Sequence, residues 1–293
     1  MTRILDGKAT SLTIEEELSK VVQDRLNRGL KRPHLAAVLV GDNPASQAYV
    51  GHKVKACSRV GFESTLVDKP TSISQSELLR VVEELNKNSS IDGFIVQLPL
   101  PDHINDQEVL EAVLPTKDVD GFHPVNAGKM ALDLPCFLPA TPMGIMSLIE
   151  RAGIDTEGKH AVILGRSSIV GTPMALLLRR NNKPGNCTVT VCHSRTENLV
   201  EHTSRADILV AAIGRAHFVT ADMVKDGAVV IDVGINRIPD ASKKSGSRLT
   251  GDVDFESVAP KCSWITPVPG GVGPMTIASL MQNTLQACIK KDA

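Results

Sequence analysis

The most constraining feature of the chain is a regular alternation of short apolar runs and helix-length spacers. In the first half, the runs are "HLAAVLVG" at 34–41, "ESTLVD" at 63–68 and "IDGFIVQLPLP" at 91–101. Short continuous apolar runs are typical of strands in a parallel sheet, because helices cover both of its faces. Strands that alternate with helices predict an α/β fold.

The same pattern starts again after Pro139, which predicts a second α/β unit. The second set of apolar runs is "HAVILG" at 160–165, "CTVTVC" at 187–192, "DILVAAIG" at 207–214 and "AVVIDVG" at 228–234. A chain of 293 residues is near the size at which one core divides into two. We therefore predict a first domain over residues 1–140 and a second over 141–274. An amphipathic helix follows from about 275 to 293.

Local signals mark several helix ends. Capping boxes are predicted at Thr13/Glu16 and Ser74/Glu77, and Gly29 and Gly61 stand where helices are expected to close. The polar stretch "PDASKKSGSRLTG" at 239–251 is predicted to be an exposed excursion. The loop "RRNNKPGNC" at 179–187 has no assigned role.

Composition excludes several classes of protein. The net charge is -1, whereas a nucleic-acid-binding protein usually carries an excess of basic residues. No apolar run reaches the roughly 18 residues of a membrane span, and the N-terminal residues show no leader, so we expect a soluble chain that starts at Met1. The six cysteines form no C-x-x-C pair, which argues against disulfides or structural zinc and favours the cytoplasm.

A candidate cofactor turn lies in "VILGRSSIVGTP" at 162–173. The stretch follows a predicted strand and opens a predicted helix, where a dinucleotide fold presents backbone N–H groups to a pyrophosphate. Gly165 and Gly171 bound the turn, but the middle glycine of G-x-G-x-x-G is missing. A helix-entry turn that only needs small residues remains the alternative.

The end of the next strand indicates which dinucleotide would bind. An NAD site usually has an acidic residue here for the ribose 2′-hydroxyl, whereas this chain has His193, Ser194 and Arg195. Together with Arg166, these groups suit a 2′-phosphate, because a guanidinium offers a planar fork to phosphate oxygens. NADP is therefore favoured over NAD. The alternative is that both arginines are solvated loop charges.

The helix predicted within 44–60 carries a candidate catalytic lysine. At 100° per residue, one arc holds Ala45, Tyr49, Lys53, Ala56, Cys57 and Val60, with Ser46 also on it. Lys53 lies in the middle of this apolar face, and Lys55 lies on the opposite side. A desolvated lysine has a lowered pKa and is a usual source of a near-neutral base. Snorkelling of Lys53 to an edge is the alternative.

Two further polar residues stand in apolar surroundings. Gln97 lies at the end of "GFIVQLPLP", and carboxyl ends of parallel strands are where open α/β sheets bind ligands. Asp120 lies in "PTKDVDGFHP", where it is either a ligand-binding group or an ordinary Asp-Gly turn residue. From the residues alone, no pairing among Lys53, Gln97 and Asp120 follows.

Four stretches, in this order, resemble one family. They are "YVGHKVKACSRVGF", "VQLPLP" with "KDVDGFHPVNAGK", "GRSSIVGTP", and "ITPVPGGVGPMT" at 265–276. The chain is similar to the bifunctional methylenetetrahydrofolate dehydrogenase/methenyltetrahydrofolate cyclohydrolase family, over nearly its whole length. The resemblance implies an enzyme of one-carbon metabolism. It would oxidise 5,10-methylenetetrahydrofolate with NADP and hydrolyse the 5,10-methenyl product to 10-formyltetrahydrofolate.

The resemblance also implies roles for residues on the folate side. Lys53 is the catalytic lysine, Gln97 contacts and tunes it, Asp120 holds the pterin, Tyr49 stacks on the aminobenzoyl ring, and Ser46 lies near the substrate. The expected substrate-binding residues further along the chain are Pro269, Gly270 and Gly273. A hinge before the last helix is another reading of "PVPGGVGP".

On the cofactor side, the resemblance matches Arg166, Ser194 and Arg195 to positions that meet the 2′-phosphate, although some relatives use NAD with magnesium and phosphate. The other expected cofactor-binding residues are Thr141, Gly165, Ser167 and Ile235. The implied architecture is two α/β domains flanking a cleft, the second Rossmann-like, with the last helix returning to the first domain. A homodimer formed through the cofactor domains is also implied.

Two rival functions remain open at this point. A shikimate-dehydrogenase-like NADP reductase also places a lysine-bearing domain before a cofactor domain, but it does not need "PVPGGVGPMT". A non-catalytic folate or nucleotide sensor is the other rival, and the presence of Lys53 argues against it. A short-chain dehydrogenase is excluded, because its Tyr-x-x-x-Lys follows the nucleotide turn, whereas Tyr49 and Lys53 precede it.

Overall fold

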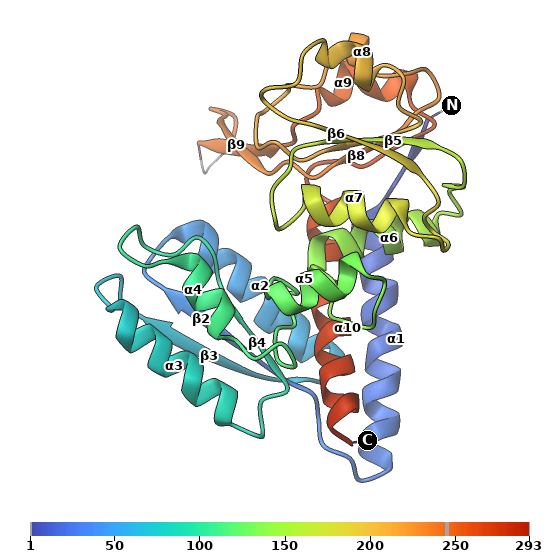
Figure 1. Cartoon of the computed structure of the whole chain (residues 1–293). Helices are drawn as coiled ribbons and strands as arrows, with labels where there is room; N and C mark the ends of the chain where they lie inside the picture. Colours follow the sequence, from blue (N-terminus) through green and yellow to red (C-terminus); the bar gives the residue numbers. More distant parts are fainter. Residues whose placement is uncertain (1, 244–245, 293) are drawn as a thin grey trace. The chain divides into compact units, whose positions relative to one another are not determined.

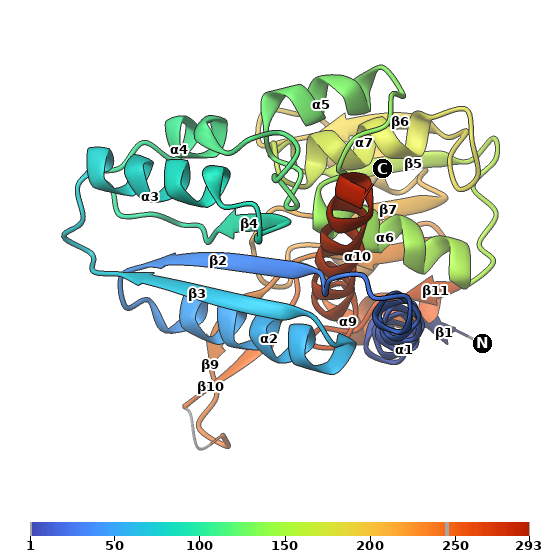
Figure 2. The same cartoon turned by 90° about the horizontal axis from the view of Figure 1, so that it is seen from below.

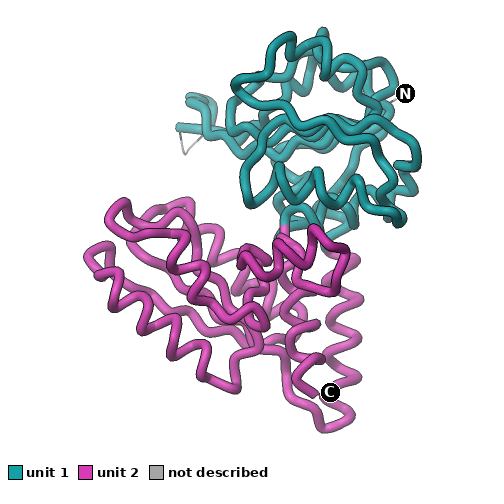
Figure 3. Tube along the Cα trace, viewed as in Figure 1, with its two compact units in different colours: residues 1–11, 141–276 teal, residues 12–140, 277–293 magenta. Residues whose placement is uncertain are grey.

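The chain forms two compact units in a computed structural model that describes residues 2–243 and 246–292. Unit 1 comprises residues 1–11 and 141–276, and unit 2 comprises residues 12–140 and 277–293 (Figure 3). Residues 1–11, predicted in the first domain, group with unit 1 in the structure. The reason is that β1 (Arg3–Ile4) pairs in parallel with β11 (Trp264–Ile265) of unit 1. The expected start at Met1 lies outside the described residues.

Unit 2 is built on a three-stranded parallel sheet in the order β3–β2–β4. The strands are β2 (His34–Val40), β3 (Glu63–Lys69) and β4 (Gly93–Val96). One face is covered by α2 (Pro44–Val60), and the other by α3 (Gln75–Lys87) and α4 (Asp106–Ala112) (Figure 2). The predicted capping box of Ser74 and Glu77 is present at the start of α3. Parallel strands thus end at one common edge of this sheet.

The greater part of two long helices and one short helix complete unit 2. They are α1 (Gly7–Asn27), α10 (Val272–Asp292) and α5 (Pro124–Ala131). The predicted capping box at Thr13 was wrong, because α1 already begins at Gly7 and Thr13 lies inside it. Near their ends α1 and α10 are joined by an ion pair of 2.8 Å between Arg25 Nη1 and Asp292 Oδ2. Among the described residues, no helix combines the length and apolarity that crossing a membrane requires.

Unit 1 contains a six-stranded parallel sheet in the order β1–β11–β8–β7–β5–β6. Its remaining strands are β5 (His160–Leu164), β6 (Thr188–Cys192), β7 (Ile208–Ala211) and β8 (Val229–Asp232). Figure 1 shows α6 (Ala140–Arg151) and α7 (Gly171–Arg179) on one face, and α8 (Leu199–Thr203) and α9 (Phe255–Val258) on the other. After β5 the chain goes first to β6 and then, on the other side, to β7. This reversal is the switch point at which doubly wound folds bind ligands.

The polar stretch at 239–251 is largely exposed in its described residues, as predicted. Its ends lie in an antiparallel pair of strands, β9 (Asn236–Pro239) and β10 (Ser247–Thr250), with Leu249 opposite Arg237; residues 244–245 are outside the described part. Two 3-10 turns, at Ala221–Met223 and Ala259–Lys261, complete the element order. The loop at 179–187 forms an ion pair of 2.8 Å between its Lys183 and Glu157.

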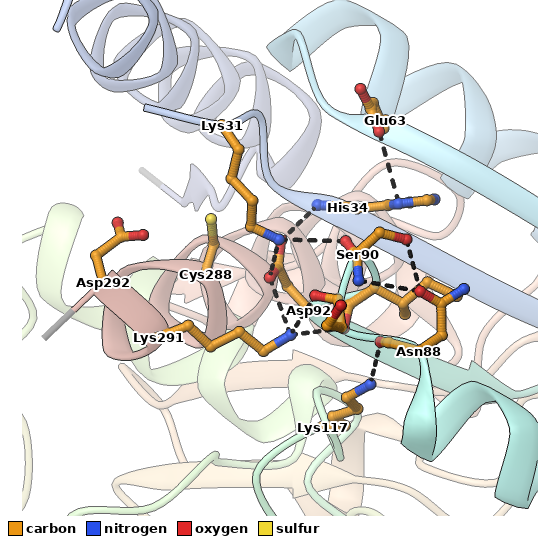
Figure 4. Close-up of polar contacts among 12 residues, drawn as sticks. Lys31, His34, Glu63, Asn88, Ser90, Asp92, Lys117, Cys288, Lys291 and Asp292 are labelled. Atoms are coloured by element: carbon orange, nitrogen blue, oxygen red, sulfur yellow. Dashed lines mark hydrogen bonds and ion pairs between the residues drawn. The ribbon is translucent and has the colours of Figure 1, made fainter. Parts of the chain in front are cut away.

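A buried carboxylate anchors the C-terminal end of α10 to the sheet of unit 2 (Figure 4). Asp92 is fully buried, and its Oδ1 accepts hydrogen bonds from Lys31 Nζ at 2.6 Å and Lys291 Nζ at 3.2 Å. Its Oδ2 accepts the backbone N–H of His34 at 2.9 Å. Burial acts to raise the pKa of Asp92, but these donors outweigh it and hold the pKa below its ordinary value.

We predict that Asp92→Asn lowers the free energy of unfolding by about 1–3 kcal/mol at neutral pH. The loss should stay modest because Lys31 and Lys291 both reach solvent. A lowered folded-state pKa contributes stability above the unfolded-state pKa of about 4 and loses it as the pH falls. The difference between variant and wild type in urea unfolding should therefore shrink below about pH 4.

The matched control is Glu83→Gln, which removes an ion pair to Lys87 in which both side chains are exposed. Its effect should be much smaller than that of Asp92→Asn. Equal losses from the two substitutions would show that Asp92 is not an anchor.

Candidate functional site

Lys53 is held inside unit 2 by the face of α2 on which it stands. The helix is started by Asn43, whose side-chain oxygen accepts the N–H groups of Ala45 and Ser46, and by Pro44 in the first turn. Lys53 is only 5% exposed, whereas Lys55 is exposed. The buried members of the helix are Ser46, Val50, Lys53, Ala56, Cys57 and Val60.

The helical wheel was therefore right about Lys53 and wrong about Ala45. Ala45 is exposed and Val50 is buried, so the buried arc is centred closer to Ser46 and Val50 than the wheel indicated. Burial lowers the pKa of Lys53, because an ammonium in an apolar environment loses its hydration, and the charge of Asp120 opposes this effect.

Gln97 is the hydrogen-bond partner of the buried amine. Lys53 Nζ donates to Gln97 Oε1 at 3.0 Å. Gln97 follows β4, and its backbone N–H extends the ladder by donating to Val38 O at 2.9 Å. The side-chain Nε2 donates to Leu98 O at 2.7 Å, which turns Oε1 toward Lys53. The carboxyl end of β4 therefore holds the amine in one direction.

Asp120 belongs to the same site as Lys53. Burial raises the pKa of its carboxyl, and the charge of Lys53 acts against that rise. The segment before it packs on the start of β4: a Cβ on Gly93 would lie 2.1 Å from a methyl carbon of Val119, and Phe94 bridges to Asp118. Gly93 is therefore needed for this segment to approach the sheet.

Two residues that the sequence reasoning missed hold the backbone on either side of Asp120. The Asp118 carboxylate accepts the N–H groups of Gly121, Phe122 and His123 and the side-chain amide of Asn126. Asn283 of α10 is buried and donates to Val119 O at 2.8 Å and to Leu138 O at 2.9 Å. The first was detectable as an Asx turn in "KDVDG". The second depends on contacts across 164 residues of chain.

Tyr49 and Ser46 occupy the same face of α2 as Lys53. The Lys53 ammonium lies 6.0 Å from the centroid of the Tyr49 ring, at the outer limit of a cation–π contact. Tyr49 is half-buried, and burial raises the pKa of its hydroxyl. Five of the predicted residues thus lie in unit 2: Ser46, Tyr49, Lys53, Gln97 and Asp120.

The predicted cofactor turn lies at the carboxyl edge of the sheet in unit 1. Gly165 follows β5 with φ +115°, and a Cβ there would lie 2.2 Å from Ala212 O. A Cβ on Gly171 would lie 2.2 Å from Gly165 O. The Ser167 hydroxyl accepts the N–H groups of Val170 and Gly171 as α7 begins. Both glycines are thus required by close backbone approach, as a tight pyrophosphate turn requires.

The predicted 2′-phosphate groups come to the same edge on neighbouring strands. Leu164 of β5 is paired with Cys192 of β6, so Arg166 and the segment with Ser194 and Arg195 both follow directly from adjacent strand ends. All three side chains are exposed. Ile235 follows β8 and is also exposed, at 49%.

The other predicted residues of unit 1 lie near α6 and the start of α10. The hydroxyl oxygens of Thr141 and Thr276 are 2.9 Å apart. Gly270, with φ +107°, accepts the Lys8 N–H on its carbonyl at 2.8 Å. Pro269, Gly270 and Gly273 therefore belong to unit 1 and not to the unit that holds Lys53.

Comparison with known proteins identifies the family. The profile "Tetrahydrofolate dehydrogenase/cyclohydrolase, catalytic domain" matches residues 5–120, and "Tetrahydrofolate dehydrogenase/cyclohydrolase, NAD(P)-binding domain" matches residues 139–292. The chain belongs to the tetrahydrofolate dehydrogenase/cyclohydrolase family. A curated relative, "Bifunctional protein FolD" of Cytophaga hutchinsonii, is 63% identical over 289 residues, covering 99% of this chain and 100% of the relative.

Solved structures agree with this membership. The bifunctional enzyme FolD from Campylobacter jejuni is 48% identical, with a TM-score of 0.93 over 99% of this chain and 100% of that one. A Trypanosoma brucei methylenetetrahydrofolate dehydrogenase-cyclohydrolase, solved with NADP and an inhibitor, is 36% identical, with a TM-score of 0.94 over 99% and 98% of the two chains. The predictions of family, enzyme, α/β fold, Rossmann-like second domain and NADP cofactor agree with these findings. A shikimate-dehydrogenase-like reductase is not supported.

Proposed function

We propose that this tetrahydrofolate dehydrogenase/cyclohydrolase carries out two consecutive steps on one folate. The first is oxidation of 5,10-methylenetetrahydrofolate to the 5,10-methenyl cation with NADP⁺, and the second is hydrolysis of the cation to 10-formyltetrahydrofolate. The observation that supports this most directly is the buried Lys53 amine, which is hydrogen-bonded to Gln97 and interacts with the charge of Asp120. A coupled spectrophotometric assay with methylenetetrahydrofolate and NADP⁺ tests it. A folded protein without turnover would favour the sensor alternative.

In the first step, the protein mainly positions two ligands. The bound NADP⁺ supplies the hydride acceptor. Gly165 and Gly171 leave no space for a side chain where the backbone of the turn closes, which fits the cradle that a pyrophosphate needs. Hydride transfer requires the reacting carbons to be held within about 3–3.5 Å, so precise seating of both ligands lowers the barrier.

In the second step, Lys53 acts as the base. Its lowered pKa increases the share of neutral amine, which can take a proton from a water molecule as the oxygen adds to the methenyl carbon. The bond from that carbon to N5 then breaks as N5 takes the proton back from the lysine, and the hydroxyl proton is released to solvent, which leaves the 10-formyl group. The cationic substrate next to the amine would favour the neutral form further. Gln97 accepts an N–H of Lys53 and so leaves the lone pair directed elsewhere, toward the water.

The remaining folate-side residues bind the substrate in this proposal. Asp120 accepts N–H groups of the pterin, Tyr49 stacks on the aminobenzoyl ring, and Ser46 contacts the folate beside them. The backbone on both sides of Asp120 is fixed by Asp118 and Asn283, which supports a binding role over that of a simple turn residue. Pro269 and Gly270, which precede α10, and Gly273 in its first turn are also proposed to contact substrate.

On the cofactor side, we assign Arg166, Ser194 and Arg195 to the 2′-phosphate of NADP. Their positions after adjacent strands and their exposure support this assignment. No acidic side chain occupies residues 193–196 at the end of β6, where an NAD enzyme would bind the ribose. The other proposed cofactor contacts are Thr141, Gly165, Ser167 and Ile235.

We further propose a cytoplasmic homodimer that joins through the cofactor domains. The support for the dimer is the family resemblance. For the cytoplasm, it is the absence of any C-x-x-C pair among the six cysteines. Sedimentation equilibrium should give twice the 31.4 kDa of one chain. A mass of one chain at micromolar concentration would contradict the dimer.

We predict that Lys53→Met lowers the rate of methenyltetrahydrofolate hydrolysis by about 10²–10⁴-fold, because the base is removed while the volume of the stem is kept. The measurement supplies methenyltetrahydrofolate directly and follows its loss. Lys55→Met is the matched control on the exposed side of the same helix, and it should change the rate little. A folded Lys53→Met variant with wild-type turnover would make Lys53 a snorkelling residue.

We predict that replacing both Arg166 and Arg195 by alanine raises the Kd for NADP⁺ by roughly 10–100-fold, about 1.4–2.8 kcal/mol for lost charged hydrogen bonds. The Kd for NAD⁺ should hardly change, because NAD⁺ lacks the 2′-phosphate. Calorimetric titration with each dinucleotide measures both. Equal catalytic efficiency of the wild-type enzyme with NAD⁺ and NADP⁺ would refute the assignment.

A further inference from the structure

Asp252 is a fully buried acid whose partners are almost all backbone N–H groups. Its Oδ2 accepts the N–H groups of Ile213 at 2.7 Å and Gly214 at 3.0 Å. Its Oδ1 accepts the Arg215 N–H at 2.8 Å and the Asn236 side-chain amide at 2.9 Å. Four converging donors can hold a carboxylate charge without a lysine or arginine beside it.

The loops held by Asp252 follow two neighbouring strands. Residues 213–215 come after β7, and Asn236 ends the segment between β8 and β9 as the first residue of β9; β7 and β8 are paired with Ala211 opposite Asp232. The first loop also touches the cofactor turn, since the missing Cβ of Gly165 would lie 2.2 Å from Ala212 O and 3.7 Å from a side-chain carbon of Ile213. Asp252 thus joins two loops at the carboxyl edge of the sheet.

A second buried acid fixes the backbone of Asp252. Asp232 accepts the N–H groups of Gly234, Asp252 and Val253 at 2.9–3.0 Å. Two glycines leave room for the pair: a Cβ on Gly234 would lie 2.3 Å from Asp252 Oδ1, and one on Gly251 would lie 1.7 Å from Asp232 Oδ2. These close approaches restrict the Asp252 carboxylate to one position.

The order of the strands indicates which half of the cofactor this pair serves. With the 2′-phosphate at the end of β6 and the pyrophosphate at the turn after β5, the nicotinamide half extends to the other side, over the ends of β7 and β8. We propose that Asp252 is a positioning residue that holds the loops against which the nicotinamide half of NADP binds. This inference rests on the cofactor placement proposed above.

The two activities and the two halves of the cofactor allow a test that separates positioning from folding. In Asp252→Asn, an amide replaces a carboxylate in front of four donors. The Kd for NADP⁺ should rise about tenfold or more, and dehydrogenase kcat at saturating NADP⁺ should fall roughly 10–100-fold. The Kd for adenosine 2′,5′-bisphosphate and the rate of methenyltetrahydrofolate hydrolysis should stay within about twofold, because neither involves the nicotinamide half.

Matched variants complete the experiment. Asn236→Ala removes one of the four donors and should shift the same two quantities in the same direction by less, which keeps the test open if Asp252→Asn folds poorly. Asp226→Asn makes the same chemical change at an exposed residue before β8 and should leave all four quantities unchanged.

Two results would overturn the proposal. One is unchanged NADP⁺ binding and dehydrogenase kcat in folded Asp252→Asn. The other is a parallel loss of both activities and of both ligands, which would make Asp252 purely structural. Failure of the cofactor placement itself is distinguishable: the double substitution of Arg166 and Arg195 would then leave binding of the bisphosphate unchanged.

Discussion

The proposed hydrolysis chemistry depends on keeping one lysine amine out of water. Lys53 is 5% exposed and donates to Gln97 Oε1 at 3.0 Å, while the Gln97 amide is itself fixed by Leu98 O. A surface lysine would be an ammonium at neutral pH and could not accept a proton. Burial on α2 lowers the pKa of Lys53, and the charge of Asp120 opposes this effect. The folate-side proposal follows from this balance of desolvation against charge.

Both units use the same geometric device to bring distant residues together. The strands of a parallel sheet end at one edge of that sheet. In unit 2 the fold therefore places Gln97 at such an edge, after β4, and in unit 1 it places the arginines at the corresponding edge, after β5 and β6. Close approach behind these edges is made possible by glycines: Gly93 lets Val119 pack on β4, and Gly165 lets the cofactor turn meet Ala212. In each unit, a carboxylate that accepts several backbone N–H groups then fixes a loop. This carboxylate is Asp118 in unit 2 and Asp252 in unit 1.

Sequence reasoning succeeded where local pattern decides the structure. The strand runs, the Ser74 capping box and the inward direction of Lys53 each follow from a period or a motif within one element. It failed where partners are far apart in the chain. The pairing of β1 with β11 places residues 1–11 in unit 1. The hydrogen bonds of Asn283 to Val119 and of Asp252 to residues 213–215 likewise have no local signal in the sequence. The capping box predicted at Thr13 is a different kind of error: the residue types of the motif are present, but they lie inside a helix that begins earlier, at Gly7.

The most direct test of this account is a nitrogen-detected NMR titration of the Lys53 amine in the folded, ligand-free enzyme, with the urea-unfolded chain as the reference. The predicted pKa lies below the ordinary lysine value of 10.5, because burial disfavours the ammonium. In Asp120→Asn the pKa should fall further, since the carboxylate that supports the charge is gone. A Lys53 pKa at or above the reference value, or one that rises in Asp120→Asn, would contradict the central claim.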